Sequence, residues 1–145
     1  MLHGLNGEDG SLQGMLDMLH VPYASTSMLG SAVGMNKIIM KDIFKAHGLP
    51  ITNHLVFNTS TVNIEQIEKK LNYPLFVKPS SLGSSIGISK VDNREELTNA
   101  IETAFYYDHD IIVEEGVPNL IELNCSVMEK NGEIITTLVE QPVSK

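Results

Sequence analysis

The chain has 145 residues, which is enough for one ordinary domain or two small lobes. Its hydrophobic content of 42% and charged content of 19% are typical of a folded protein, and its net charge of −8 argues against non-specific binding to nucleic acids or anionic membranes. No apolar run reaches the roughly 18 residues of a membrane span, the N-terminus lacks the pattern of a signal peptide, and the single Cys125 cannot form an internal disulfide. We therefore expect a cytoplasmic protein in a reducing compartment.

The first third of the chain is expected to be mainly helical. A turn-rich loop over residues 4–10 contains three glycines together with Glu8 and Asp9. Asp9 is most simply interpreted as the N-cap of the helix that follows. Helices are predicted where apolar residues recur at helical spacing, over residues 11–20, 28–33 and 36–47.

From residue 55 onward, strand and helix patterns alternate. Strands are predicted over residues 55–58, 75–78, 86–91 and 111–115, and helices over residues 63–72 and 93–107. Asn63 and Asn93 are followed three residues later by Gln66 and Glu96, the capping-box spacing that marks a helix start. The order predicts a split β-α-β arrangement, an α+β fold whose open-faced sheet carries its helices on one side. A closing hairpin of strands over residues 120–128 and 134–139 is predicted around Asn131-Gly132.

The most informative segment connects two of the predicted strands. It reads Phe76-Val77-Lys78-Pro79-Ser80-Ser81-Leu82-Gly83-Ser84-Ser85-Ile86-Gly87-Ile88. Glycines let a backbone approach a ligand, hydroxyls donate hydrogen bonds and a lysine supplies a point charge, so this composition suits a polyphosphate held between two strands. It is not a Walker loop, in which the lysine follows the glycines and a helix comes next. A strand-end lysine with a plain hairpin connection is the structural alternative, but the connection over residues 79–85 is longer than a minimal hairpin needs.

Other candidate residues carry weaker signals. Lys37 opens a helix, where a positive charge is mildly unfavourable; it either faces an anion or is an ordinary surface lysine. Glu114 and Glu115 follow a strand, either as a solvated strand end or as a hinge facing a purine and a ribose. Glu122 alternates with apolar neighbours, and most such glutamates face solvent. The five histidines, His3 included, show no zinc-type spacing, so no metal ligand is assigned.

Taken together, these elements resemble the D-alanine–D-alanine ligase family of ATP-grasp enzymes, from His3 to about Val127. The resemblance is carried by His3-Gly4-x-x-Gly7-Glu8-Asp9-Gly10, Gln13-Gly14, Val21-Pro22-Tyr23, Met35-Asn36-Lys37, Gly48-Leu49-Pro50, Phe76-Val77-Lys78-Pro79, Gly83-Ser84-Ser85-Ile86-Gly87-Ile88-Ser89-Lys90-Val91 and Val113-Glu114-Glu115-Gly116. It implies three parts: the end of a Rossmann-like N-terminal lobe (residues 1–34), a central ATP-grasp lobe (residues 35–116) and the start of a C-terminal lobe (residues 117–145).

The resemblance also implies roles at the phosphate and amino-acid sites. Lys37 and Lys78 resemble the pair that contacts the phosphates of ATP. Ser84 resembles the catalytic-loop serine that helps to orient a D-alanine substrate, and Ser85 lies in the same phosphate-covering loop. His3 resembles a histidine near the first D-alanine.

For the nucleoside, the resemblance implies that Glu114, Glu115, Gly116 and Val117 form the hinge that holds adenine, and that Glu122 binds ribose. In that family ATP phosphorylates the carboxylate of one D-alanine, and the amine of a second attacks the acylphosphate. Mg²⁺ ions balance the charge of the phosphates. The product is a precursor of peptidoglycan.

The chain departs from the family pattern in three ways. It begins at the His-Gly loop, it ends before the family's arginine and its Mg²⁺ ligands, and Asn36 stands where the family usually has aspartate. The first expectation is therefore a part of a ligase that is inactive by itself. The alternatives are a non-catalytic nucleotide-binding module, a ligase that makes D-Ala-D-Ser or D-Ala-D-lactate, or another ATP-grasp ligase. The second substrate and the oligomeric state, a homodimer included, stay open.

Overall fold

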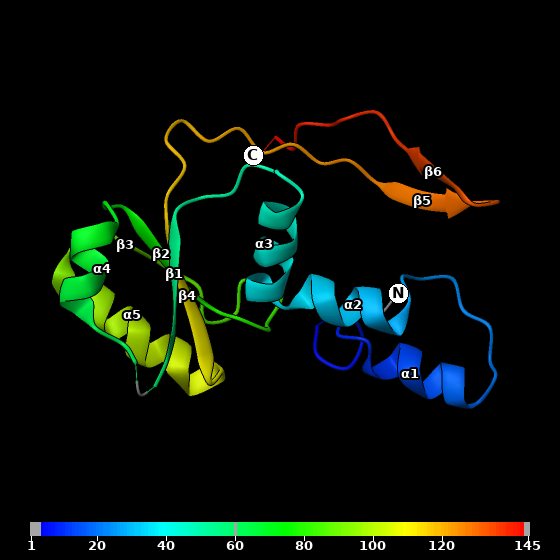
Figure 1. Cartoon of the computed structure of the whole chain (residues 1–145), viewed down its shortest axis with the longest axis horizontal. Coiled ribbons are helices and arrows are strands. Elements are labelled where there is room, and N and C mark those ends of the chain that lie inside the picture. The colour runs from blue at the N-terminus through cyan, green and yellow to red at the C-terminus, as the bar shows by residue number, and fades with distance from the viewer. Residues whose placement is uncertain (1–3, 60, 144–145) are drawn as a thin grey trace.

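The computed structural model describes residues 4–59 and 61–143 (Figure 1). The helices are α1 (Ser11–Met18), α2 (Met28–Met35), α3 (Lys37–Ala46), α4 (Ile64–Lys70) and α5 (Arg94–Tyr107). The strands are β1 (His54–Asn58), β2 (Leu75–Pro79), β3 (Ser89–Val91), β4 (Asp110–Glu115), β5 (Val127–Lys130) and β6 (Glu133–Thr136).

Four strands form one antiparallel sheet in the order β1-β4-β2-β3. In its register, Phe76 of β2 lies opposite Lys90 of β3 on one side and opposite Glu114 of β4 on the other. The segment between β2 and β3, residues 80–88, is the serine loop. A parallel crossover needs a dozen or more residues, so a connection of this length joins antiparallel strands. The predicted antiparallel pairing of these two strands is confirmed.

Helices α4 and α5 cover one face of this sheet, as predicted. Side chains alternate along a strand, and Leu75, Val77, Ile111 and Val113 point toward the helices. The buried core that forms there consists of Phe57, Ile67, Leu71, Leu75, Val77, Val91, Leu97, Ala100, Ile101, Ala104, Ile111 and Val113. Burial of each large apolar side chain contributes roughly 1.5–3 kcal/mol, so this layer fixes both helices on the sheet.

Both asparagine caps occur where the sequence predicts them. The Asn63 side chain accepts a hydrogen bond from the Gln66 backbone N–H, and Asn93 accepts one from the Glu96 N–H, each at 3.0 Å. Glu96 also accepts bonds from the Asp92 N–H and the Asn93 amide, both at 2.8 Å. These bonds satisfy N–H groups that the first turn of a helix leaves without a partner.

The other face of the sheet meets α3. Phe76, Lys78 and Glu114 belong to the strand positions that alternate with the core residues, so they point to this side. The Lys41 ammonium of α3 lies 2.8 Å from a Glu114 carboxylate oxygen, which ties the helix to the sheet. In Figure 1, α3 stands between the sheet and α2. This α3-side face carries the candidate site.

The strand predicted over residues 86–91 is wrong in its first half. β3 contains only Ser89–Val91. Ser84, Ser85 and Gly87 have φ angles of 52°, 59° and 70°, which belong to the left-handed region and not to an extended strand.

The closing hairpin is shorter than predicted. β5 begins at Val127 and β6 ends at Thr136, so residues 120–126 and 137–139 lie outside the two strands. The turn itself is confirmed, because Asn131 and Gly132 have φ angles of 56° and 81°, as a type I′ turn requires.

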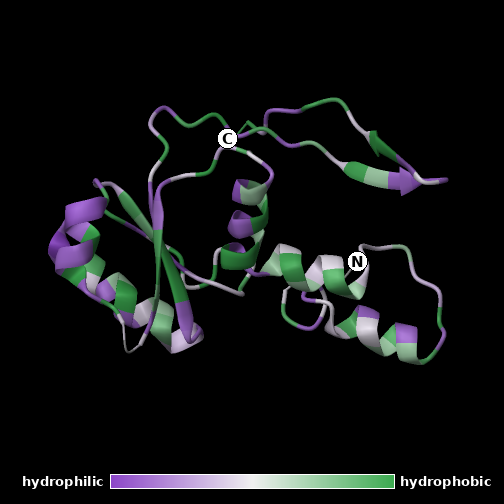
Figure 2. Cartoon of the chain, viewed as in Figure 1, coloured by the Kyte–Doolittle hydropathy of each residue, from purple (hydrophilic) through white to green (hydrophobic). Residues whose placement is uncertain are grey.

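Helices α1 and α2 and the β5–β6 hairpin lie away from the four-stranded sheet (Figure 1). Each strand of the hairpin carries two adjacent apolar residues (Figure 2), and Val127 and Ile134 among them are 63% and 68% exposed. Within the described part of the chain, helices are too short or too polar to cross a membrane. The division at residues 34 and 116 stays a prediction.

Candidate functional site

Helix α3 begins at the serine loop and brings Lys37 to it. The Asn36 side chain caps the helix by accepting from the N–H groups of Ile38 and Ile39, at 3.1 and 3.0 Å. The Lys37 backbone N–H donates to the Ser80 carbonyl at 2.8 Å, and its ammonium donates to the Leu82 carbonyl. Both ends of Lys37 are thus held against the base of the loop.

Lys37 and Lys78 lie close enough for their charges to interact. Burial lowers the pKa of the Lys37 ammonium, and the positive charge of Lys78 lowers it further. The carboxylates of Asp108 and Glu114 oppose this shift, but the pKa of Lys37 stays lowered, so a further anion beside Lys37 would stabilise its charged form. This is the electrostatic requirement of a phosphate site.

Glu114 is the most buried ionisable group of this face. It is 7% exposed, and its carboxylate is paired with the ammonium groups of both Lys78 and Lys41. The Thr52 hydroxyl also donates to it, at 3.1 Å. Burial raises the pKa of Glu114, but the bonds and charges of the two lysines outweigh burial and hold the pKa below its usual range. Glu114 is therefore a buried, paired carboxylate on the α3-side face and not a solvated strand end.

The serine loop is held at its base by a chain of hydrogen bonds. The Asn36 amide donates to the Ser81 hydroxyl at 3.1 Å, and the Ser80 and Ser81 hydroxyls lie 2.9 Å apart. The Ser80 hydroxyl and the Ser81 N–H both donate to one carboxylate oxygen of Asp108, at 2.7 and 2.8 Å. Ser84 and Ser85, further along the loop, are exposed and have left-handed φ angles, a conformation that proteins often retain at functional sites.

The predicted hinge follows β4 directly. The Glu115 carboxylate accepts from the Asn72 N–H at 2.7 Å, the Asn72 amide at 2.9 Å and the Asn53 amide at 2.8 Å. These bonds hold the pKa of Glu115 below its usual range. The Gly116 N–H donates to the Pro74 carbonyl at 2.8 Å. The side chain of Glu115 and the backbone of Gly116 thus anchor the hinge to neighbouring turns.

The structure does not bring every predicted residue to this face. Residues 116–126, between β4 and β5, lie outside the named strands and are called the irregular segment. Val117 lies at its start and is 51% exposed. Glu122 lies exposed in the same segment, outside the strand that was predicted to orient it. His3 lies outside the described residues.

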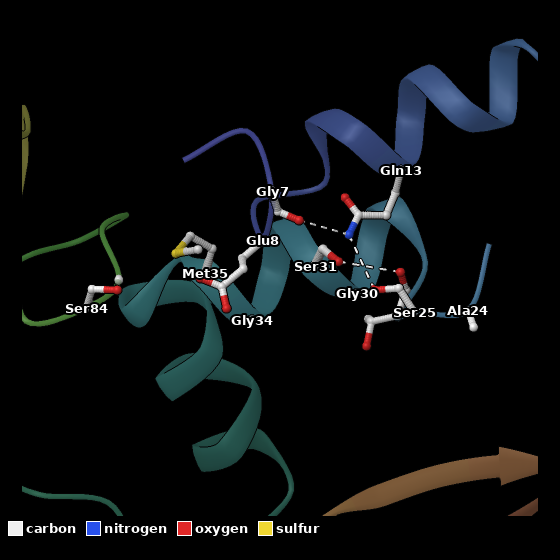
Figure 3. Close-up of a pocket in the computed structure, with 12 residues that line it drawn as sticks. Gly7, Glu8, Gln13, Ala24, Ser25, Gly30, Ser31, Gly34, Met35 and Ser84 are labelled. Carbon is white, nitrogen blue, oxygen red and sulfur yellow. Dashed lines mark hydrogen bonds between the residues drawn. The ribbon is translucent and has the colours of Figure 1, made fainter. Parts of the chain in front are cut away.

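A cavity of about 670 Å³ lies between the serine loop and the region of α1 and α2 (Figure 3). Gly83 and Ser84 reach it from the loop, and Gly7 and Glu8 reach it from the segment before α1. Figure 3 shows Ser84 across from Glu8. The serine loop therefore forms part of the wall of this cavity, and Ser84 faces it.

Metal ligands were not predicted for this chain. Over residues 4–59 and 61–143, histidine, cysteine and carboxylate side chains form no cluster of three or more that could hold a metal ion.

Sequence reasoning missed Lys41, Thr52 and Asp108. Lys41 could have been found, because it follows Lys37 by four residues and so shares its helix face. Asp108 also left a signal, since a carboxylate at the C-terminal end of α5 is unfavourable unless something else binds it. Thr52 left no signal in the sequence, because it lies in the connection before β1.

Comparisons with known proteins agree with this geometry. The family model described as the C-terminus of D-ala D-ala ligases matches residues 43–145. A D-alanine–D-alanine ligase from Bacillus velezensis is 51% identical over 123 residues, which cover 81% of this chain and 35% of the relative.

Solved structures give the same result. The D-alanine–D-alanine ligase of Coxiella burnetii superposes with a TM-score of 0.89 at 32% identity, over 99% of this chain and 43% of that one. The VanG D-Ala:D-Ser ligase of Enterococcus faecalis gives 0.88 at 38% identity, over 97% of this chain and 41% of that one. The predicted ATP-grasp fold is thereby confirmed. The chain spans 34–40% of the length of the curated relatives it matches. This chain belongs to the D-alanine–D-alanine ligase family.

Proposed function

We propose that this chain supplies the ATP-binding face and one wall of the amino-acid cavity of a D-alanine–D-alanine ligase. The observation that carries the proposal is the grouping of Lys37, Lys78 and Glu114 beneath the serine loop. Two cations and a fixed carboxylate on the α3-side face suit a nucleotide, whose phosphates need positive charge and whose base needs hydrogen-bond partners.

In this proposal the phosphates lie between Lys37 and Lys78, and the hydroxyls and N–H groups of Ser84 and Ser85 cover them. An anion between the lysines would relieve the repulsion that lowers the pKa of Lys37. Ser84 also faces the cavity, where it orients a D-alanine, and His3 belongs to the same amino-acid site.

The nucleoside lies along the hinge. Glu114, Glu115, Gly116 and Val117 hold adenine, with Glu115 contributing through its backbone because its carboxylate is bound to Asn53 and Asn72. Glu122 binds ribose once the irregular segment closes on the nucleotide. The fixed groups place the γ-phosphate next to a D-alanine carboxylate, so that an acylphosphate forms there. No described residue is proposed as a ligand of Mg²⁺.

A thermal-stability titration tests the nucleotide site. ATP should raise the melting temperature of the 145-residue chain, and Lys78→Ala should abolish the rise. Linkage gives about 0.4 kcal/mol when the ligand concentration equals the Kd, so ATP is added in large excess. Lys70→Ala is the matched control, because Lys70 is exposed at the end of α4, which covers the opposite face of the sheet. A melting temperature of the unmutated chain that millimolar ATP leaves unchanged would contradict the proposal.

A non-catalytic nucleotide-binding module is the second candidate. The missing metal cluster among the described residues and the 34–40% span of the relatives favour it for the chain taken alone. D-alanine-dependent release of phosphate from ATP, measured on the natural full-length gene product, separates the two candidates. The likeness to a D-Ala:D-Ser ligase also makes D-serine the competing second substrate to include in that assay.

The proposed setting follows from the substrates. ATP, Mg²⁺ and D-alanine are supplied in the cytoplasm, where ligation would feed peptidoglycan synthesis. A homodimer is compatible with the exposed apolar hairpin.

A further inference from the structure

We propose that Lys41 and Thr52 are positioning residues that fix the Glu114 carboxylate for recognition of the amino group of an adenine base. The inference rests on the proposed function and deepens it, because it assigns nucleobase selectivity to two side chains that do not themselves touch the nucleotide.

The donor and acceptor of each hydrogen bond around Glu114 follow from the chemistry of the groups. An ammonium donates and never accepts, so Lys41 donates to the Thr52 hydroxyl at 2.8 Å. The hydroxyl then donates its own hydrogen to the Glu114 carboxylate, at 3.1 Å. Lys41 also lies 2.8 Å from the same carboxylate oxygen, Oε2. The three groups form a closed triangle that holds this oxygen in place.

The remaining acceptor capacity of Glu114 lies on its other oxygen, Oε1. Lys78 binds there, and a carboxylate oxygen has two lone pairs. One acceptor position is therefore left for a donor from a ligand. The exocyclic amino group of adenine is such a donor, whereas guanine presents a carbonyl oxygen at the corresponding position. An ionised, fixed Glu114 accepts the first and repels the second.

Lys41 is needed as a second counter-ion of Glu114, because Lys78 is proposed to bind both the Glu114 carboxylate and the phosphates of ATP. When phosphates draw Lys78 away, Glu114 would lose its counter-ion and become a buried, unpaired charge. Lys41 and Thr52 keep the carboxylate paired in that state. Both lysine side chains are largely buried, 13% exposed for Lys41 and 23% for Lys78, so neither pair is strongly screened by solvent.

Among the described residues, the charged or titratable groups around Glu114 come from α3, β2 and β1. Lys41 and Lys37 come from α3 and Lys78 from β2. His54 of β1 is its register partner, and the His54 ring nitrogen Nδ1 lies 3.0 Å from the Thr52 carbonyl. Removal of Lys41 therefore leaves Lys78 as the only group in direct ion-pair contact with the carboxylate among the described residues, and the pKa of Glu114 rises.

The test compares Lys41→Met with Lys45→Met, an exposed lysine one turn further along α3. Kd values for ATP and GTP are measured on the 145-residue chain between about pH 5 and about pH 8. We expect Lys41→Met to weaken ATP binding about tenfold, to lower the ATP-over-GTP preference by a similar factor, and to move the acid limb of ATP binding to higher pH. Lys45→Met should change each value less than about twofold. Phosphate protonation affects both variants equally, so it cancels in the comparison.

Thr52→Val and Thr52→Ser provide a second pair in case Lys41→Met does not fold. Valine removes the hydroxyl and should lower the ATP-over-GTP preference about threefold, while serine keeps the hydroxyl and the preference. Lys41→Arg should restore most of the affinity, because it restores the charge. If the unmutated chain binds ATP but Lys41→Met keeps the preference and pH profile of Lys45→Met, the inference is overturned and the proposed function stands. If the unmutated chain binds no ATP, both fall.

Discussion

Gly87 is a residue of the serine loop that no other amino acid can replace without strain. Its φ angle is 70°, and a Cβ atom there would lie 2.7 Å from the Pro79 ring and 2.8 Å from the Tyr107 ring. Gly87→Ala should therefore lower the free energy of unfolding by about 2–4 kcal/mol, since the left-handed backbone and the overpacking both cost energy. Gly132→Ala is the control, because Gly132 has a φ angle of 81° but open space around it. Chemical denaturation of both variants should separate the two costs; equal destabilisation would show that packing around Gly87 is loose.

Asp108 should make the stability of the loop dependent on pH. Burial raises the pKa of Asp108, but the bonds from Ser80 and Ser81 outweigh burial and hold the pKa below its usual range. A carboxyl whose pKa is lowered on folding stabilises the protein above its unfolded pKa of about 3.9, and this stabilisation is lost as the pH falls through the folded value.

Asp108→Ala should accordingly lower the free energy of unfolding by about 1–3 kcal/mol at neutral pH, and by less as the pH falls below about 4. Asp110→Ala, two residues later and with an exposed side chain, serves as the control. Urea titrations at several pH values give the comparison. A penalty for Asp108→Ala that stays constant down to the lowest pH would contradict the role of the ionised carboxylate.

At the scale of elements, the sequence predicted the helices and most of the strands well because each has its own local signal. The capping asparagines fix where α4 and α5 begin, and the apolar stripe of α5 shows which side is buried. β3 was predicted too long because Ile86 and Ile88 look like strand residues, while the left-handed turn between them depends on packing of Gly87 against Pro79 and Tyr107. Such packing leaves no periodic pattern in a sequence.

The site residues also divide into those with a local signal in the sequence and those whose position depends on packing. Lys37, Lys78 and Glu114 were predicted from loop composition and family resemblance, and the structure brings them together. Lys41 and Thr52 were not, since their importance depends on how α3 and the connection before β1 lie against β4. Glu122 was assigned to a strand that ends up irregular, so its role stays a prediction.

The apolar stripe of α5 gives a prediction about packing. Leu97 is fully buried against the sheet, whereas Asn99 on the same helix is exposed. Leu97→Ala should lower the free energy of unfolding by about 2–5 kcal/mol, and Asn99→Ala by less than about 0.5 kcal/mol. Thermal or chemical denaturation measures both. A small effect of Leu97→Ala would mean that α5 does not share one core with the sheet.

The whole molecule leaves much apolar surface uncovered. Val127, Ile134 and Leu138 are 63%, 68% and 92% exposed. Large exposed apolar side chains in such number often mark an interface, so the 145-residue chain should associate as its concentration rises. Analytical ultracentrifugation should show a mass that increases with concentration, and Ile134→Ser with Leu138→Ser should reduce it. A monomer at all concentrations would argue against this surface as a contact.

The chain by itself should not ligate D-alanine. The chain spans 34–40% of the length of its relatives, and a barrier that a whole set of placed charges lowers is not lowered by a part of that set. Phosphate release from ATP should therefore show no D-alanine dependence above that of Lys78→Ala. Sustained D-alanine-dependent release by the unmutated chain would contradict this expectation and would favour a complete active site.

The central claim is that ATP binds on the α3-side face of the sheet, beneath the serine loop. The most direct measurement is an NMR titration of the isotopically labelled chain with ATP. The account predicts that the amide signals of residues 78–87 and 114–117 shift and saturate together, while those along α4 and the outer side of α5 stay in place. Shifts confined to the groove lined by Val62, Ile64 and Phe105 on the opposite side, or no shifts at saturating ATP, would contradict it.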